Sequence, residues 1–413
     1  PDRLKMVIMR LPRTELRRTI GLPVLLFYGL GNILGAGIYV LIGKVAGEAA
    51  IYAPFAFLVA SIVATFSAFS YSEMSARYPL SAGEAVYIDE GFHLPSLSRL
   101  TGLLIAFAGM VSAATIARGF YGYFYNFIEA PELLVISSLI ILLGLLTIWG
   151  ISQSVGFAAA LTLFEIAGLL LVIWSGKDLL INMPADIDRL LPPLETSVWS
   201  GIMLGGFLAF FAFIGFEDMV NIAEEVKDPQ RTLPASILLA LLIATLIYAL
   251  VALVSVLALD QQTLADSNAP LADVISATSG MNPKIISSIG LFAVINGALI
   301  QMIMASRIFY GMAKKGWLWK GLAKVSDKTH TPVNATWLVI AIVLNLALWF
   351  PLEELAKGTS YLILVVFALV NASLISIKHS HSYVDGILKV PTWVPIAGLV
   401  SSITLAVFQL FFG

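Results

Sequence analysis

An acidic residue in an apolar stretch is the side chain of this sequence with the clearest chemical potential. Glu165 stands in the segment Leu161–Leu169, with apolar residues on both sides. If this segment crosses a bilayer, an ionised carboxylate in it is costly, and such residues usually mark a path for ions or protons. The carboxyl could carry a proton or bind a hard cation such as sodium. Alternatively, it braces neighbouring helices through Ser306 or backbone N–H groups.

Two glycine-rich stretches could do chemistry with their backbone. Gly29–Tyr39 holds four glycines within nine residues, and Gly205–Glu217 holds three more. A glycine in a helix interior costs about 1 kcal/mol relative to alanine. A broken helix at membrane depth is tolerated only where it lines a cavity. The bland alternative is close helix packing, since Gly31 and Gly35 form a G-x-x-x-G pair. Two such stretches instead favour a binding site built from backbone groups.

The composition indicates a polytopic membrane protein. Of the 413 residues, 59% are hydrophobic and only 12% are charged, whereas soluble domains average about 25% charged residues. A net charge of −2 argues against a nucleic-acid-binding protein. Because the sequence has no cysteine, disulfides, thiol catalysis and cysteine-bound metals are excluded. The four histidines lie near segment ends or in loops. We therefore expect no metal site and no cofactor.

Apolar runs predict about 11 spans, because about 20 apolar residues cross a bilayer. We expect them at roughly 20–47, 53–76, 84–125, 133–150, 156–176, 197–228, 233–259, 283–312, 333–350, 358–378 and 392–412. Three are too long for one straight crossing. The third begins with an oblique lead-in, and the first and sixth carry the glycine interruptions.

The basic residues orient these spans. The segment 1–19 is rich in Lys and Arg and lacks the features of a signal peptide. If it is cytoplasmic, the inner segments hold three times as many Lys and Arg residues as the outer ones, as the positive-inside rule requires. An odd number of spans then places the C-terminus outside.

The two halves of the chain mirror each other. Spans 1–5 and spans 6–10 each begin with a glycine-interrupted segment, and five is odd, so the second half has inverted topology. This arrangement is typical of secondary transporters. We expect a transporter core at 20–380, made of repeats at 20–176 and 197–380, and an additional transmembrane helix at 381–413.

Four motifs resemble those of the amino acid–polyamine–organocation (APC) superfamily, and the cationic amino acid transporter-like permeases most of all. The motifs are Gly35–Leu41 in the first span, the P-x-A-G-x-x-Y-like segment Pro79–Tyr87, the sixth-span signature Phe210–Glu217 followed by Ala223–Arg231, and Ser306–Ala313. The likeness runs over residues 15–412 in register. It implies an all-α, five-plus-five inverted-repeat fold of the leucine-transporter type, with helices 1 and 6 broken. It also implies an amino acid as the substrate.

An amino acid is a zwitterion, so its site must offer donors to a carboxylate and acceptors to an ammonium group. The exposed helix start at Gly35, Ala36 and Gly37 suits the carboxylate, because its N–H groups are unpaired and its dipole is positive. Carbonyl groups at the broken ends suit the ammonium. The expected substrate-binding residues are therefore Ile33, Gly35, Ala36, Gly37, Phe211, Ala212, Ile214 and Gly215.

The resemblance also bears on the roles of two phenylalanines and two glutamates. Phe211 or Phe213 would be an aromatic lid over the ligand, although ordinary packing explains a phenylalanine equally well. Glu217 stands where a relative has aspartate, and it either faces a cationic substrate side chain or caps the inner half of the helix. Glu165 lies about 13 Å past the inner end of its span, counted at 1.5 Å per residue. In proton-coupled relatives a lysine occupies this place, so Glu165 departs from their pattern.

These observations favour a secondary active transporter of neutral or cationic amino acids in the cell membrane, working by alternating access and coupled to protons through Glu165. Exchange and sodium coupling with the same site stay open as alternatives. A channel would need a polar pore, and an enzyme would need a cluster of catalytic side chains. The sequence shows neither. The expected partners are the amino acid, protons and the lipid bilayer, with no nucleic acid. The oligomeric state and the transported side chain stay open.

Overall fold

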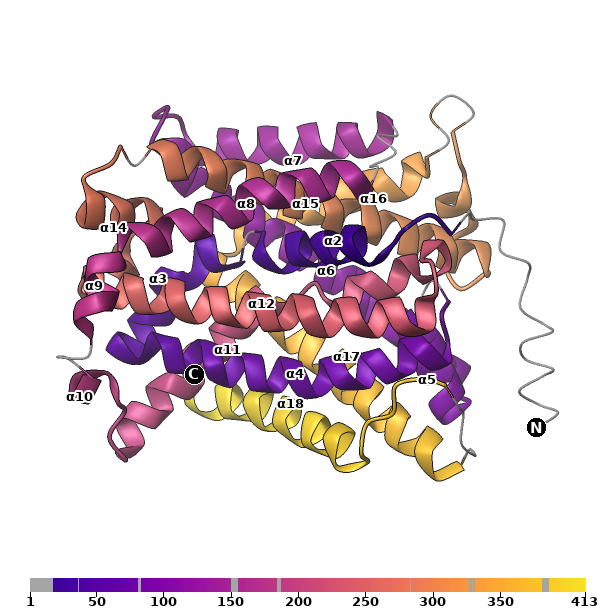
Figure 1. Ribbon diagram of the computed structural model, residues 1–413. Helices are drawn as coiled ribbons and strands as arrows, with labels where there is room; N and C mark the ends of the chain where they lie inside the picture. The colour runs from indigo at the N-terminus through magenta and orange to yellow at the C-terminus, as the bar shows by residue number, and fades with distance from the viewer. Residues whose placement is uncertain are drawn as a thin grey trace.

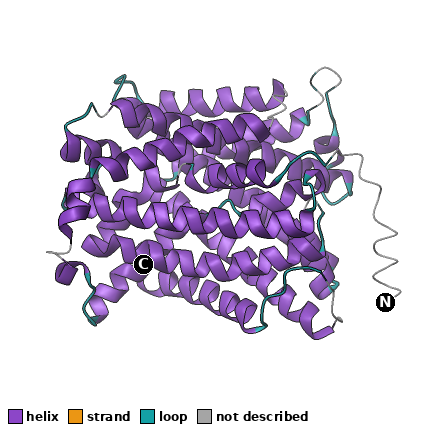
Figure 2. Ribbon diagram, in the orientation of Figure 1, coloured by secondary structure: helices purple, strands orange, loops and turns teal. Residues whose placement is uncertain are grey.

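The computed structural model describes residues 18–35, 37–80, 83–149, 155–183, 187–282, 284–326, 329, 331–380 and 386–413. Within these ranges the chain is helical apart from its loops and one isolated bridge between Ile20 and Val226 (Figure 2). The long helices are α2 (Leu22–Leu34), α3 (Gly37–Ala49), α4 (Ala53–Arg77), α6 (Pro95–Tyr125), α7 (Glu132–Trp149), α8 (Val155–Ser175), α11 (Thr196–Phe213), α12 (Pro229–Ala258), α15 (Lys284–Lys314), α16 (Val333–Trp349), α17 (Leu352–Ser380) and α18 (Trp393–Phe412).

Shorter helices connect the long ones. They are η1 (Ala50–Tyr52), α5 (Gly83–Phe92), α9 (Lys177–Asn182), α10 (Ile187–Leu190), η3 (Glu217–Glu225), α13 (Gln261–Asp266), α14 (Pro270–Ser279) and η4 (Lys320–Ala323). Proline stands at the first or second position of α4, α6 and α12. Its missing N–H and fixed φ angle suit the start of a helix.

The lengths and compositions of these helices fit a multi-pass membrane protein. Within the described residues, seven stretches are long and apolar enough to cross a bilayer, and the first of them, Leu22–Arg77, contains α2, α3 and α4. Three shorter apolar helices cover Glu132–Ile148, Leu161–Ser175 and Val333–Trp349. The count of about 11 spans stays a prediction.

The first predicted interruption is present. Helix α2 ends at Leu34, where the N–H of Gly35 donates to the carbonyl oxygen of Gly31 at 3.1 Å. Helix α3 begins at Gly37, and Ala36 lies outside the described residues. Gly29 and Gly31 lie within α2, so the interruption is confined to the end of the glycine-rich stretch.

The second interruption is narrower than the sequence predicts. Helix α11 continues through Gly205 and Gly206 and ends at Phe213. The break covers only 214–216, where Gly215 has a φ of +129°. This conformation is open to glycine and strained for other residues. After it, Glu217–Glu225 continues as a 3₁₀ helix.

The expected third span consists of two helices. Helix α5 ends at Phe92, and α6 begins at Pro95 after His93, which has a positive φ of 54°. The predicted lead-in is therefore a separate helix. It packs against both α6 and α17.

The long helices lie side by side and run along a common direction (Figure 1). Helices α2 and α3 follow one another through the bundle, and α2 packs against α8 and α12. Helix α11 packs against α3 and α4, and α15 packs against α6 and α8. The two interrupted helices therefore lie among other helices of the bundle, α2 against α8 and α12 and α11 against α3 and α4.

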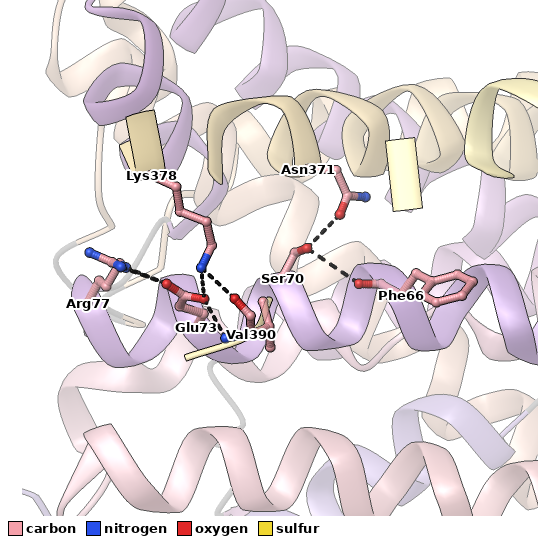
Figure 3. A network of polar contacts seen from close by, with 7 residues as sticks. All are labelled: Phe66, Ser70, Glu73, Arg77, Asn371, Lys378 and Val390. Atoms are coloured by element: carbon pink, nitrogen blue, oxygen red, sulfur yellow. Dashed lines mark hydrogen bonds and ion pairs between the residues drawn. The ribbon is translucent and has the colours of Figure 1, made fainter. Parts of the chain in front are cut away.

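A buried ionic network ties α4 to α17 and to the chain before α18 (Figure 3). The fully buried Glu73 pairs with Arg77 at 2.6 Å and with Lys378 at 2.7 Å, and it accepts the N–H of Val390 at 2.8 Å. Every oxygen of this carboxylate is therefore satisfied, as burial of a charge requires.

Candidate functional site

The two interruptions line one cavity. Asn32, Ile33 and Gly37 contribute to its wall from the first interruption, and Phe211 and Ile214 from the second. The remaining lining residues come from two neighbouring helices and are Ser112 and Ile116 of α6 and Gly297 and Gln301 of α15. Four predicted site residues, Ile33, Gly37, Phe211 and Ile214, thus lie together around one internal space.

Glycine permits the close approach of the two interruptions. A Cβ atom on Gly37 would lie 2.8 Å from the Cβ of Ala212. A Cβ on Gly215 would lie 2.8 Å from the carbonyl oxygen of Asn32. A side chain at either position would force the two broken helices apart. The glycines therefore let the backbones of the two segments approach each other closely.

Tyr248 of α12 connects both interruptions. Its hydroxyl lies 2.5 Å from the carbonyl oxygen of Ile33 and 3.0 Å from that of Ala212. A hydroxyl has a single proton, so it donates fully to one carbonyl at a time. Each carbonyl oxygen has two lone pairs, and both therefore keep capacity for an ammonium group. Sequence reasoning missed Tyr248 because it stands in an apolar helix far along the chain.

Some of the groups predicted to bind the substrate already form hydrogen bonds within the protein. The N–H of Gly35 is used within α2, so it is not the free donor that the sequence predicts. The carbonyl of Phe211 already accepts the N–H of Ile214 at 3.3 Å. An additional donor that the sequence did not suggest is the side-chain amide of Asn32, whose Nδ2 atom is buried without a partner.

The two lid candidates occupy different places. Phe211 lines the cavity. Phe213 is 1% exposed, and its ring packs against Tyr248 at 5.1 Å and Phe57 at 6.4 Å between centroids. Phe213 is therefore part of the packing around α12, which leaves Phe211 as the side chain placed to contact a ligand.

Glu165 is buried beside the first interruption. Its side chain is 1% exposed, and its Oε1 atom accepts from the amide of Asn296 on α15 at 3.3 Å, whereas Oε2 has no partner. The hydroxyl of Tyr39 on α3 donates to its main-chain carbonyl at 2.9 Å. The hydroxyl of Ser306, one of the partners that the bracing alternative names, donates to the carbonyl of Ile303 in its own helix.

Glu217 braces the second interruption. Its Oε2 atom accepts the N–H of Gly215 at 2.9 Å, and the residue is 3% exposed. This contact satisfies a backbone donor that the irregular segment would otherwise leave without a partner. The contact lies in the break itself, and η3 has no side-chain cap at its start, so capping of the inner half stays a prediction. A role of Glu217 in choosing the substrate side chain stays a prediction.

The chain resembles known transporters along nearly its whole length. It is 30% identical to an uncharacterized transporter of Mycobacterium tuberculosis over 396 residues, which cover 95% of this chain and 86% of the relative. The branched-chain amino acid permease of Lactococcus lactis is 26% identical over 91% of this chain and 86% of its own length. The cationic amino acid transporter 3 of Arabidopsis thaliana is 27% identical over 88% of this chain and 63% of its own length.

The family model described as "Amino acid permease" matches residues 20–413. The match includes both interruptions and Glu165, and the relatives carry names of transporters and permeases rather than enzymes. The predicted resemblance to the APC superfamily is thereby confirmed. The chain belongs to the amino acid permease family of membrane transport proteins.

Proposed function

We propose that this chain is a secondary active transporter that carries neutral or cationic amino acids across the cell membrane by alternating access, together with protons. The observation that carries the proposal is the cavity that both interruptions line. Unpaired backbone groups at membrane depth are tolerated only where a cavity or a ligand satisfies them. The carboxylate of a zwitterion complements free N–H groups at a helix start, and its ammonium group complements free carbonyl groups at a helix end.

The proposed topology follows from the order of the helices. The interrupted helix α2–α3 opens the repeat at 20–176, and α11–η3 opens the repeat at 197–380. With five spans in each, the second repeat is inverted relative to the first, and the site lies between them. The segment 1–19 is then cytoplasmic, and α18 lies outside the five-plus-five core.

Glu165 carries the proton in this mechanism. It is almost fully buried, has one oxygen without a partner, and contacts α3 and α15 through Tyr39 and Asn296. Buried carboxyls of this kind usually serve ion or proton pathways. The carboxyl binds a proton from the outside with the substrate and releases it to inner water when α2 and α3 move apart.

Transport by the purified full-length chain in proteoliposomes tests the proposal. With the outer solution more acidic than the lumen, labelled leucine or lysine should accumulate above its outside concentration. Glu165→Gln should still allow downhill uptake but should no longer accumulate substrate. Glu129→Gln serves as the matched control, because that glutamate is exposed in a loop.

The outcomes separate the mechanisms. Absence of uptake for every standard amino acid would overturn the transporter assignment. Accumulation by Glu165→Gln under the same pH gradient would remove Glu165 as the proton carrier. Uptake that needs substrate in the lumen indicates an exchanger, and uptake that needs sodium indicates sodium coupling.

A further inference from the structure

A second cavity adjoins the one between the interruptions. The two cavities share Ser112, Ile214 and Gln301 in their walls. The second one extends away from the interruptions between α6, α15 and α17. A ligand whose head group occupies the first cavity would therefore lie next to the second.

Three carboxylates line this second cavity. Glu84 of α5 is 2% exposed, Glu217 is 3% exposed and Asp218 is 4% exposed. Glu217 is engaged with the backbone of Gly215. Asp218 accepts from the amide of Gln301 at 3.2 Å, and the Oε1 atom of Glu84 has no hydrogen-bond partner.

These acids form no ion pair within the part of the chain that the structure describes. Glu73 in the same protein shows the usual arrangement, since two basic side chains neutralise it. Buried charges that have no such partner are costly. A cationic group of a ligand could therefore supply the positive charge that these acids lack.

The remaining walls suit a hydrocarbon chain. Ile105 and Ile308 line the cavity together with Ile363 and Val366 of α17. Methylene groups bury well against apolar surface while a terminal charge reaches polar partners. The unpartnered amide of Asn32 in the adjoining cavity offers a donor at the opposite end. One end of the joined cavities thus offers a donor for the carboxylate of an amino acid, and the other end offers acids for a cation.

We propose that Glu84 and Asp218 form a subsite for the terminal cationic group of the substrate, so that the transported class is amino acids with an aliphatic, positively charged side chain. This inference rests on the proposed transport function and narrows its substrate. Glu217 supports the subsite by holding Gly215 in place, and the apolar wall contacts the methylene groups.

Lysine and norleucine provide the test, because norleucine has a similar unbranched aliphatic chain without the terminal amine. Their dissociation constants are measured on the purified full-length protein by ligand-dependent thermal stabilisation, which rises with occupancy. Hydrogen bonds to charged groups correspond to roughly a tenfold or larger change in affinity. We expect lysine to bind at least about tenfold more tightly than norleucine.

Two variants locate the effect. Glu84→Gln and Asp218→Asn should each weaken lysine binding by about tenfold or more and leave norleucine binding unchanged. Their matched controls are Glu129→Gln and Asp178→Asn, which remove the same groups from exposed positions. If a variant does not fold, the comparison of lysine with norleucine on the unaltered protein still decides.

Equal or tighter binding of norleucine would overturn the cationic subsite and leave amino acid transport intact. Equal losses for both ligands in the variants would overturn it as well, because they would indicate a structural role for the acids. If neither ligand nor any standard amino acid binds, the proposed function itself fails.

Discussion

The hydroxyl of Tyr248 lies 2.5 Å from the carbonyl oxygen of Ile33, across 215 residues of sequence. The same hydroxyl is 3.0 Å from the carbonyl oxygen of Ala212. One side chain of an uninterrupted helix therefore contacts both broken helices at the points where their hydrogen-bond ladders end. Movement of either broken helix relative to α12 would change this contact.

Tyr248→Phe removes this connection without changing the ring packing. The carbonyls of Ile33 and Ala212 then lose the one neutral hydrogen bond that they share, worth about 1 kcal/mol. We expect the variant to fold, to bind substrate several-fold less tightly and to transport it more slowly. Binding and initial uptake rates measure the effect. Tyr121→Phe is the control, because that hydroxyl donates to Ala130 at 3.3 Å on a loop outside the cavity. Equal effects of the two substitutions would contradict the role of Tyr248.

Gly215→Ala should damage the second interruption. The φ of +129° is strained for alanine, and the added Cβ would lie 2.8 Å from the carbonyl oxygen of Asn32. Strain of this type costs about 1–3 kcal/mol. We expect a lower midpoint of thermal unfolding and a loss of uptake. Gly311→Ala is the control, since a Cβ there meets nothing within 4 Å. An unaltered uptake rate in Gly215→Ala would show that the two interruptions need not approach so closely.

The interruptions could be predicted because the energetic cost of glycine is local. Four glycines in a short apolar stretch are unfavourable in any helix, so their presence indicates a break near Gly35. The exact place was harder to predict. Gly205 and Gly206 look as disruptive as Gly215 in the sequence, yet they lie within α11. Only the φ of Gly215 distinguishes them, and φ depends on contacts with the other broken helix.

The partners of the buried polar groups could not be predicted. Asn296 contacts Glu165 from 131 residues away, and Gln301 contacts Asp218 from 83 residues away. Both amides stand in an apolar helix and have no local signal that sets them apart. Their roles arise only when α15 packs against α6 and α8. Long-range packing, rather than local preference, therefore completes the candidate site.

Asn296→Leu tests the pairing with Glu165. The substitution leaves the buried carboxyl without its amide donor, which costs about 1–3 kcal/mol. We expect a lower unfolding midpoint and weaker accumulation of substrate under a pH gradient. The double variant Glu165→Gln, Asn296→Leu should lose less stability than the sum of the two single changes, because contacting residues couple. Additive losses measured by thermal unfolding would contradict a direct interaction.

Glu73→Gln tests whether the network in Figure 3 holds α4 and α17 together. Glu73 is fully buried and pairs with both Arg77 and Lys378. Removing its charge leaves two basic groups without their partner, and breaking a buried pair in this way costs about 3–5 kcal/mol. We expect a large drop in the unfolding midpoint of the purified protein.

The control for this change is Glu353→Gln. Glu353 pairs with Lys357 at 3.0 Å, but its side chain is 36% exposed, and exposed pairs contribute about 0–1 kcal/mol. Because the Glu73 network lies away from the residues that line the two cavities, the folded fraction of Glu73→Gln should still bind lysine with unchanged affinity. A normal unfolding midpoint would show that apolar packing alone holds α4 against α17. A selective loss of binding would place Glu73 in the transport cycle instead.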